Sequence, residues 1–351
     1  MDSNNLIFIF FLIIFNIFFY KYFLIILKKI SPELLVDNQF KKPQAFHEFS
    51  ISTSGGTLIF FSFLILCLFF LFTKQVIYYE YLSFCIPFFL LGLLDDLRLN
   101  IRPKFRLILM ISFLITSIIL NNFYIENTGI SFLNRLLEID IFALFFICLC
   151  FLFIINGSNL VDGYNGLLSI HSIIILLNLF FVNYLNSNQD LAFFILCQIL
   201  ILIIFLKHNF PKASVFLGDS GSYLLGAFIA VSVIKTSIAN PLISPFYFCI
   251  LLFYLFFEVF FSFIRKIAYE KKSPLFPDQK HLHMLIYKNF LRKYKNKLKS
   301  NYNVSILINS TYCVMIIPAI FMMKNGLFCK YYSIMFFIIY LLAYKKYGKK
   351  K

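Results

Sequence analysis

The chain has 351 residues, of which 61% are hydrophobic and only 14% charged, with 50 Phe, 21 Tyr and no Trp. This composition excludes a soluble globular protein and is typical of a polytopic membrane protein. The net charge of +16 does not require nucleic acid as a partner, because basic segments beside a bilayer bind anionic lipid headgroups and fix topology.

A helix needs about 20 apolar residues to cross the hydrocarbon core of a membrane. The sequence therefore predicts an all-α fold with eleven transmembrane helices, or ten if one short segment does not span. These segments are residues 6–27, 55–73, 76–94, 105–122, 139–156, 166–185, 190–206, 221–237, 244–264, 303–323 and 329–344. The first segment lacks a small-residue cleavage site, so we expect a retained span. Without a linker or repeat, residues 1–351 are expected to form a single membrane domain.

Lysine and arginine set the expected orientation. If odd-numbered spans run inward, 27 of the 32 Lys and Arg residues fall in inner segments and five in outer ones. The sequence therefore predicts an outer N-terminus, an inner C-terminus and five inner loops that hold nearly all of the polar motifs. Loops that face one compartment can form one site, which we expect on the inner side of the membrane.

Asp95 and Asp96 end the third predicted span, in "LLGLLDDLRLN". Acids at a helix C-terminus oppose the helix macrodipole, so local structure disfavours them there. The pair is either a solvated helix end beside Arg98 or Arg102, or a functional pair. Two adjacent carboxylates can bind a metal, or can raise one pKa into the range of a general base.

The segment "NGSNLVDGYNG" places Asn156, Asn159 and Asp162 three residues apart. Steps of three bring side chains together on a helix face, and the glycines among them let a backbone approach a ligand closely. Amides beside one acid suit a hard cation or a phosphate. The alternative is an ordinary polar turn between two spans.

In "FLGDSGS", Asp219, Ser220 and Ser222 immediately precede the eighth predicted span. They are either N-caps of that helix or part of an anion site at its N-terminus. In the second case, an acid would repel a bound phosphate, so we expect a divalent cation between Asp219 and the phosphate.

The fifth inner loop holds "PDQKHLHML", in which His281 and His283 would point the same way in an extended segment. No third ligand at zinc spacing is near them in the sequence. Basic neighbours, including Arg265 and Lys280, favour phosphate recognition over metal binding, and a solvated basic loop is the alternative. Glu258, about two turns before Arg265, is an intramembrane acid with either a functional or a structural role.

The chain resembles the polyprenyl-phosphate N-acetylhexosamine-1-phosphate transferases in five segments, in order: "KKPQAFHEFSISTSGG", "DDL…RPKFRL", "NGSNLVDGYNGL", "FPKASVFLGDSGSYLLG" and "SPLFPDQKHLHML". This glycosyltransferase superfamily (family 4) holds the initiating enzyme of enterobacterial common antigen and the phospho-MurNAc-pentapeptide translocase. Ser52 stands where these enzymes commonly have proline, and Met284 where a further histidine often follows. Because the translocase branch typically has three consecutive histidines, this sequence favours the UDP-N-acetylhexosamine branch.

The resemblance implies a Mg²⁺-dependent enzyme, with Mn²⁺ as an alternative ion. Such an enzyme moves a sugar 1-phosphate, for example GlcNAc-1-phosphate, from a UDP-sugar to a polyprenyl phosphate for cell-envelope polysaccharide synthesis. Besides these two substrates, membrane lipids are expected partners, a homodimer stays open and nucleic acid is not expected. The implied catalytic residues are Asp95, Asp96, Asp162 and Asp219; the metal ligands are Asp219 and Asn159; the substrate-binding residues are Asn156, Asn159, Asn165, Lys104, Arg265, Lys280, His281, His283 and His47.

Two other functions fit parts of this pattern. One is transfer of phospho-MurNAc-pentapeptide in peptidoglycan synthesis. The other is transport or lipid flipping, but transporters tend to place their sites near the midplane and to contain internal repeats. The polar motifs here gather toward one surface without a visible repeat, so the sequence favours an enzyme.

Overall fold

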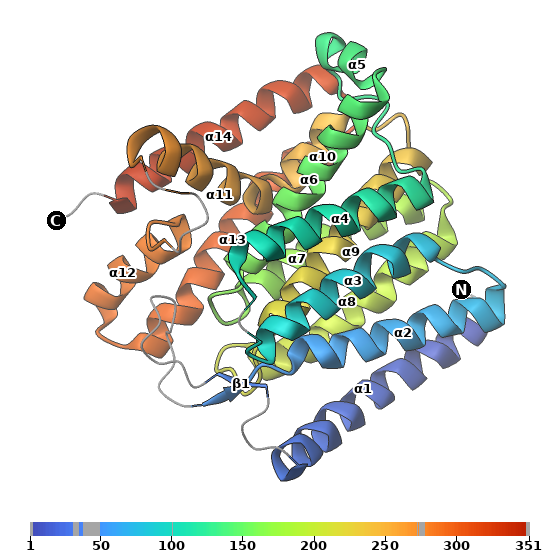
Figure 1. Cartoon of the computed structure of the whole chain (residues 1–351), viewed down its shortest axis with the longest axis vertical. Coiled ribbons are helices and arrows are strands. Elements are labelled where there is room, and N and C mark those ends of the chain that lie inside the picture. Colours follow the sequence, from blue (N-terminus) through green and yellow to red (C-terminus); the bar gives the residue numbers. More distant parts are fainter. Residues whose placement is uncertain are drawn as a thin grey trace.

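A computed structural model describes residues 3–30, 35–37, 50–99, 101–271, 273 and 278–348 of the chain. These residues form fourteen α-helices, one π-helical turn and a two-stranded antiparallel pairing. The elements are α1 (Ser3–Ile30), β1 (Val36–Asp37), β2 (Ile51–Ser52), α2 (Gly55–Lys74), α3 (Tyr79–Asp96), α4 (Pro103–Asn121), α5 (Ser131–Leu137), α6 (Asp140–Val161), α7 (Leu167–Leu185), α8 (Gln189–Asn209), α9 (Gly218–Ala239), α10 (Pro245–Leu251), α11 (Phe253–Ile264), η1 (Arg265–Tyr269), α12 (Leu282–Tyr294), α13 (Lys297–Phe321) and α14 (Gly326–Gly348). Figure 1 shows them as a helical bundle.

Ten of the eleven predicted spans each coincide with one helix, and residues 244–264 coincide with the pair α10 and α11. This confirms an all-α, multi-pass membrane protein. Within the described chain, nine helices are long and apolar enough to cross a bilayer, or ten if α10 and α11 count as one span bent by 76°. Helix α3 holds the predicted span 76–94 but is not among them. Its 18 residues include Glu80, Asp95 and Asp96, and three acids lower its apolar content.

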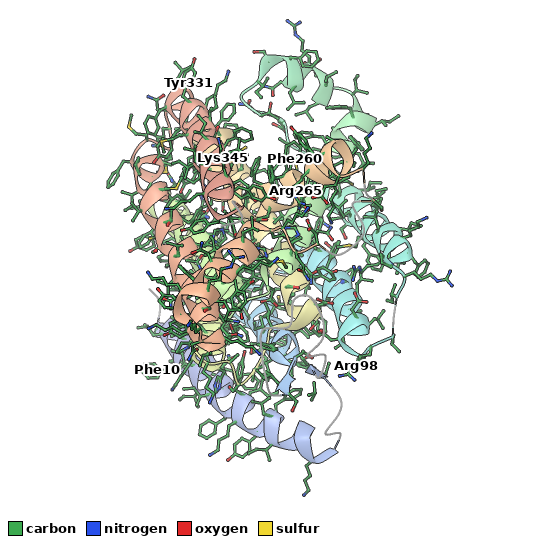
Figure 2. All side chains as sticks on the ribbon, turned by 90° about the vertical axis from the view of Figure 1, so that its left-hand side faces the viewer. Phe10, Arg98, Phe260, Arg265, Tyr331 and Lys345 are labelled. Carbon is green, nitrogen blue, oxygen red and sulfur yellow. The ribbon has the colours of Figure 1, made fainter. Side chains whose placement is uncertain are left out.

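Helix α9 lies in the middle of the bundle, where α2, α3, α6 and α7 pack around it (Figure 1). It is buried along most of its length. Small residues such as Gly226, Ala227 and Ala230 line it, and small side chains let membrane helices approach closely. By contrast, α1 and α14 lie at the edges and expose apolar side chains. Phe10 and Tyr331, labelled in Figure 2, are 71% and 67% exposed and suit contact with lipid.

Glycines allow the closest approaches between backbones. A Cβ atom at Gly56 of α2 would overlap the backbone of Gly221, and one at Gly92 of α3 would overlap the carbonyl group of Asp219. The first turn of α9 is therefore in direct backbone contact with two other helices. Gly157 of α6 meets the carbonyl oxygen of Leu255 in α11 in the same way.

We predict that Gly157→Ala destabilises the fold by about 1–3 kcal/mol, the usual cost of overpacking a core. The added methyl group would overlap a backbone atom of α11, so α6 and α11 must separate. Thermal unfolding of the detergent-solubilised protein would measure the change. The matched control is Gly163→Ala, because no described atom lies within 4 Å of a Cβ atom at Gly163. Equal midpoints for the two variants would contradict the prediction.

Candidate active site

Asp96, the last residue of α3, caps the N-terminus of α9. Its Oδ1 accepts the backbone N–H of Asp219 at 2.9 Å, and its Oδ2 accepts the backbone N–H of Ser220 at 3.0 Å and the Ser220 hydroxyl at 2.6 Å. The first amides of a helix have no partner within the helix and carry partial positive charge. Asp96 therefore supplies from another helix what Asp219 or Ser220 was expected to supply as an N-cap.

Gly218 makes this capping possible. Its φ of +78° lies in the left-handed region that favours glycine. A Cβ atom there would lie 2.6 Å from Oδ2 of Asp96. Any other residue at this position would strain the backbone and push the carboxylate away.

Asp219 itself contacts the end of α6. Its Oδ1 accepts a hydrogen bond from Nδ2 of Asn159 at 2.6 Å, and the same nitrogen donates to the Ser222 hydroxyl at 3.0 Å. Asn159 and Asp219, the two predicted metal ligands, are therefore neighbours. Asn156 instead donates to the carbonyl oxygen of Leu152 in its own helix at 2.8 Å.

Asp162 follows α6 and completes a group of carboxylates. Burial raises its pKa well above the ordinary value, and the charges of Asp219 and Asp96 raise it further. Burial and the nearby Asp219 also raise the pKa of Asp96 to about 7, although its bonds to Ser220 oppose the shift. Three predicted catalytic acids therefore lie close enough to repel one another.

Asp95 pairs with α4. Its Oδ2 accepts a hydrogen bond from Nη1 of Arg106 at 2.7 Å. Lys104, in the first turn of α4, is exposed. The two adjacent acids therefore differ, since Asp96 holds a helix start whereas Asp95 is paired with a partly exposed cation.

Asn165 holds the loop after α6 in place. Its backbone N–H donates to Oδ1 of Asn301 at 2.8 Å, its Nδ2 donates to the carbonyl oxygen of Pro211 at 2.9 Å, and its carbonyl oxygen accepts the Ser305 hydroxyl at 2.7 Å. This side chain was predicted to shape the nucleotide pocket. In the structure this side chain ties the loop to the segment after α8, and the Asn165 backbone ties it to α13.

The two histidines of loop five gather around Glu258. Nδ1 of His281 lies 3.2 Å from Oε2 of Glu258, and the backbone N–H of Leu282 donates to Oε1 at 3.2 Å. The rings of His281 and His283 are parallel, with centroids 5.5 Å apart. The Tyr164 ring, two residues after Asp162, lies 5.6 Å from the ring of His283. Tyr164 thus joins the histidine pair to the loop that carries Asp162.

Ion pairs hold the remaining basic residues of loop five. Arg265 pairs with Glu270 at 2.8 Å and also with Asp278, and Lys280 pairs with Glu270 at 2.7 Å. Burial opposes ionisation of Asp278, but its bond with Arg265 keeps its pKa below the ordinary value. Figure 2 labels Arg265 beside the end of α11. Asp278 and Glu270 were not among the predicted site residues, although each lies within five residues of a predicted phosphate-binding cation.

Two further expectations concern His47 and a metal ion. His47 lies outside the described residues. Among the described residues, the structure has no cluster of three or more His, Cys, Asp or Glu side chains arranged to hold a metal ion. A cation here would need amide, hydroxyl or substrate oxygens as further ligands.

We predict that Asp96→Asn loosens the start of α9. The Asn amide has one acceptor oxygen and an NH₂ group in place of the other, and a buried donor left without a partner costs roughly 1–3 kcal/mol. Hydrogen exchange at the amides of Asp219 and Ser220 should therefore become about tenfold faster or more. Asp95→Asn is the adjacent control, because Asp95 pairs with Arg106. Equal exchange in the two variants would refute the capping role.

Comparison with known proteins supports one family. The model of the family described as "Glycosyl transferase family 4" matches residues 77–237. The chain is 33% identical over 237 residues, 68% of each chain, to an undecaprenyl-phosphate alpha-N-acetylglucosaminyl 1-phosphate transferase of Thermotoga maritima. It is 32% identical to a phospho-N-acetylmuramoyl-pentapeptide-transferase of Helicobacter hepaticus, over 44% of this chain and 52% of that relative. It is 37% identical to one of Dictyoglomus turgidum, over 48% of this chain and 55% of that relative.

Three observations indicate the same family: the five motifs, the helical membrane fold and the match that covers 68% of the Thermotoga relative. The chain therefore belongs to glycosyl transferase family 4, the polyprenyl-phosphate N-acetylhexosamine-1-phosphate transferase superfamily, which confirms the family expected from its motifs.

Proposed function

We propose that this protein transfers an N-acetylhexosamine 1-phosphate, such as GlcNAc-1-phosphate, from a UDP-sugar to a polyprenyl phosphate and releases UMP. One observation carries the proposal: Asp96, Asn159, Asp162 and Asp219, from three separate segments, gather at the start of α9. The name of the Thermotoga relative supports undecaprenyl phosphate and an N-acetylglucosaminyl 1-phosphate group as substrates.

The reaction exchanges one phosphoanhydride for another. An oxygen of the polyprenyl phosphate forms a bond to the sugar-bearing phosphorus of the UDP-sugar. The bond from that phosphorus to the bridging oxygen breaks, and its electron pair leaves with UMP. The protein must bring two anions together against Coulomb repulsion.

The residues present fit a Mg²⁺ ion, or Mn²⁺ in its place. Mg²⁺ is usually held by one or two carboxylates together with substrate phosphates, so a larger protein cluster is not needed. Asp219 and Asn159 would hold it, and the mutual repulsion of Asp96, Asp162 and Asp219 favours a cation among them. When bound, the ion would neutralise charge on the phosphates.

The two adjacent acids are suited to different tasks. The oxygens of Asp96 are used by the start of α9, so Asp96 shapes the site. Asp95, with Arg106 beside it, is the better candidate to receive the lipid phosphate or to remove its proton. Lys104, Lys280 and His281 would attract and orient the phosphates or the sugar, whereas His283 is fully buried.

We further propose that the site faces the cytoplasm of a bacterial cell at the inner membrane. The nucleotide is soluble in water and the acceptor has a long apolar tail, so their phosphates can meet only near the interface. The distribution of Lys and Arg supports an outer N-terminus.

Transfer of phospho-MurNAc-pentapeptide is the second candidate, because relatives with that name also match. The chain spans about half the length of those relatives and lacks three consecutive histidines at 281–283. A panel of UDP-sugars, including UDP-GlcNAc and UDP-MurNAc-pentapeptide, would separate the two. Uptake of labelled sugar nucleotide into vesicles without UMP release would instead indicate a transporter.

We predict that Asp219→Asn and Asp95→Asn each reduce UMP release by at least roughly 100-fold, the scale of losing one key electrostatic group. Chelation of divalent cations should abolish the wild-type activity, and added Mg²⁺ should restore it. Asp190→Asn is a control, because Asp190 pairs with Lys74 at the start of α8, whereas the site loop follows the end of that helix. Near wild-type rates in purified, folded Asp219→Asn would refute the assignment.

Topology can be tested separately. Reporter fusions ending at Leu99 and Lys212 should report the cytoplasm, and fusions ending at Thr128 and Ser187 should report the outer side. The expectation follows from the concentration of basic residues in the inner loops. If the fusions at Leu99 and Lys212 reported opposite sides of the membrane, Asp96 and Asp219 could not be neighbours. That result would contradict the proposed site.

A further inference from the structure

Glu258 is a buried acid that the proposed reaction does not use. It lies in α11 and is 1% exposed. A buried carboxylate is costly unless its oxygens are hydrogen-bonded or paired. Both oxygens of Glu258 meet the start of α12: Oε1 accepts the backbone N–H of Leu282, and Oε2 faces Nδ1 of His281, each at 3.2 Å.

This contact decides how His281 is presented. The two nitrogens of an imidazole lie on opposite sides of the ring, and the hydrogen bond of one fixes which role the other can take. Because Nδ1 of His281 faces an acceptor-only carboxylate, Nδ1 carries a proton and Nε2 is the nitrogen left for another group. Neighbouring contacts support the same arrangement, since Asp278, three residues before His281, is held by Arg265.

His283 is placed differently. It is 0% exposed, whereas His281 retains 3%. Nδ1 of His283 lies 3.3 Å from the Tyr254 hydroxyl and 3.9 Å from Oε1 of Glu258. Burial lowers the pKa of His283 to about 4, so the ring is neutral near pH 7. The ring of His283 is parallel to the ring of His281 and stacks on it, with the two centroids 5.5 Å apart.

We propose that Glu258 is a positioning residue, which fixes the ring orientation and the protonated Nδ1 of His281 so that Nε2 of His281 serves the substrate. His283 then supports the His281 ring by packing and does not contact the substrate. This inference rests on the proposed function, because it assigns work within the same site. It also resolves the two readings of Glu258 that its sequence position leaves open.

The main test is Glu258→Gln in a double-mutant cycle with His281→Ala. Glutamine keeps an oxygen for the Leu282 N–H but presents an NH₂ group toward Nδ1–H. Loss of an outer partner of this kind typically lowers activity about 10- to 100-fold, and we expect that loss in kcat for UMP release, with a smaller change in KM. In the His281→Ala background, the same substitution should change kcat by less than about twofold, because coupled residues are not additive.

A purely structural role predicts a different result. If Glu258 only holds α12 to α11, the losses in kcat multiply in the double variant, and that outcome would overturn the proposal. Glu80→Gln is the matched control, because Glu80 pairs with Lys235 in the spans away from the site, and its kcat should equal that of the wild type. Absence of UMP release by the wild-type protein would reject the proposed function before any variant is compared.

A second measurement covers the case in which Glu258→Gln does not fold. The ¹⁵N spectrum of histidine-labelled wild-type protein in nanodiscs reports the protonation of each ring nitrogen, and His281→Ala assigns the signals. Protonated Nδ1 in His281 supports the positioning role. Unprotonated Nδ1 in His281 would overturn it.

Discussion

The site depends on one interaction, the contact between the Asp96 carboxylate and the first amides of α9. A helix N-terminus needs acceptors, and a partly buried carboxylate needs donors. Each requirement is met by the other, across 123 residues of sequence. Because Asp219 lies in that first turn, this contact places it beside Asn159 of α6 and near Asp162. Without a fixed start to α9, these acids would have no common position.

The same arrangement occurs again at α12. There, Glu258 of α11 accepts the first amide of the helix and also meets the ring of His281. In both places an acid from one helix fixes the start of another, and the residue next to that start belongs to the proposed machinery. Each of these acids stabilises a helix start, and in the proposed function it also positions a group of the site. This explains why acids are found where a sequence-based argument alone finds them unfavourable.

The sequence predicted the helices well because apolar length and basic flanks are local signals. It did not predict the 76° bend between α10 and α11, because residues 244–264 are a continuous apolar run whose only Pro lies at its start. At the site, motif types identified Asn159 and Asp219, which the structure brings together. Partners were harder to predict: Asn165 is bound by Asn301 and Ser305, and Arg265 by Asp278. Such pairings depend on packing between distant segments, which one sequence does not reveal.

The glycine contacts of α9 have a mechanical consequence. Backbone touches backbone at Gly56 and Gly92, with no side chain between them that could change rotamer and yield. These contacts hold α2, α3 and α9 together as one block. Between α11 and α12, by contrast, contacts run through the Glu258 side chain, and Arg265 and Lys280 pair with acids through long side chains that can reorient. Movement of α12 relative to α11 therefore needs only changes of side-chain rotamer, whereas α2, α3 and α9 can move only together.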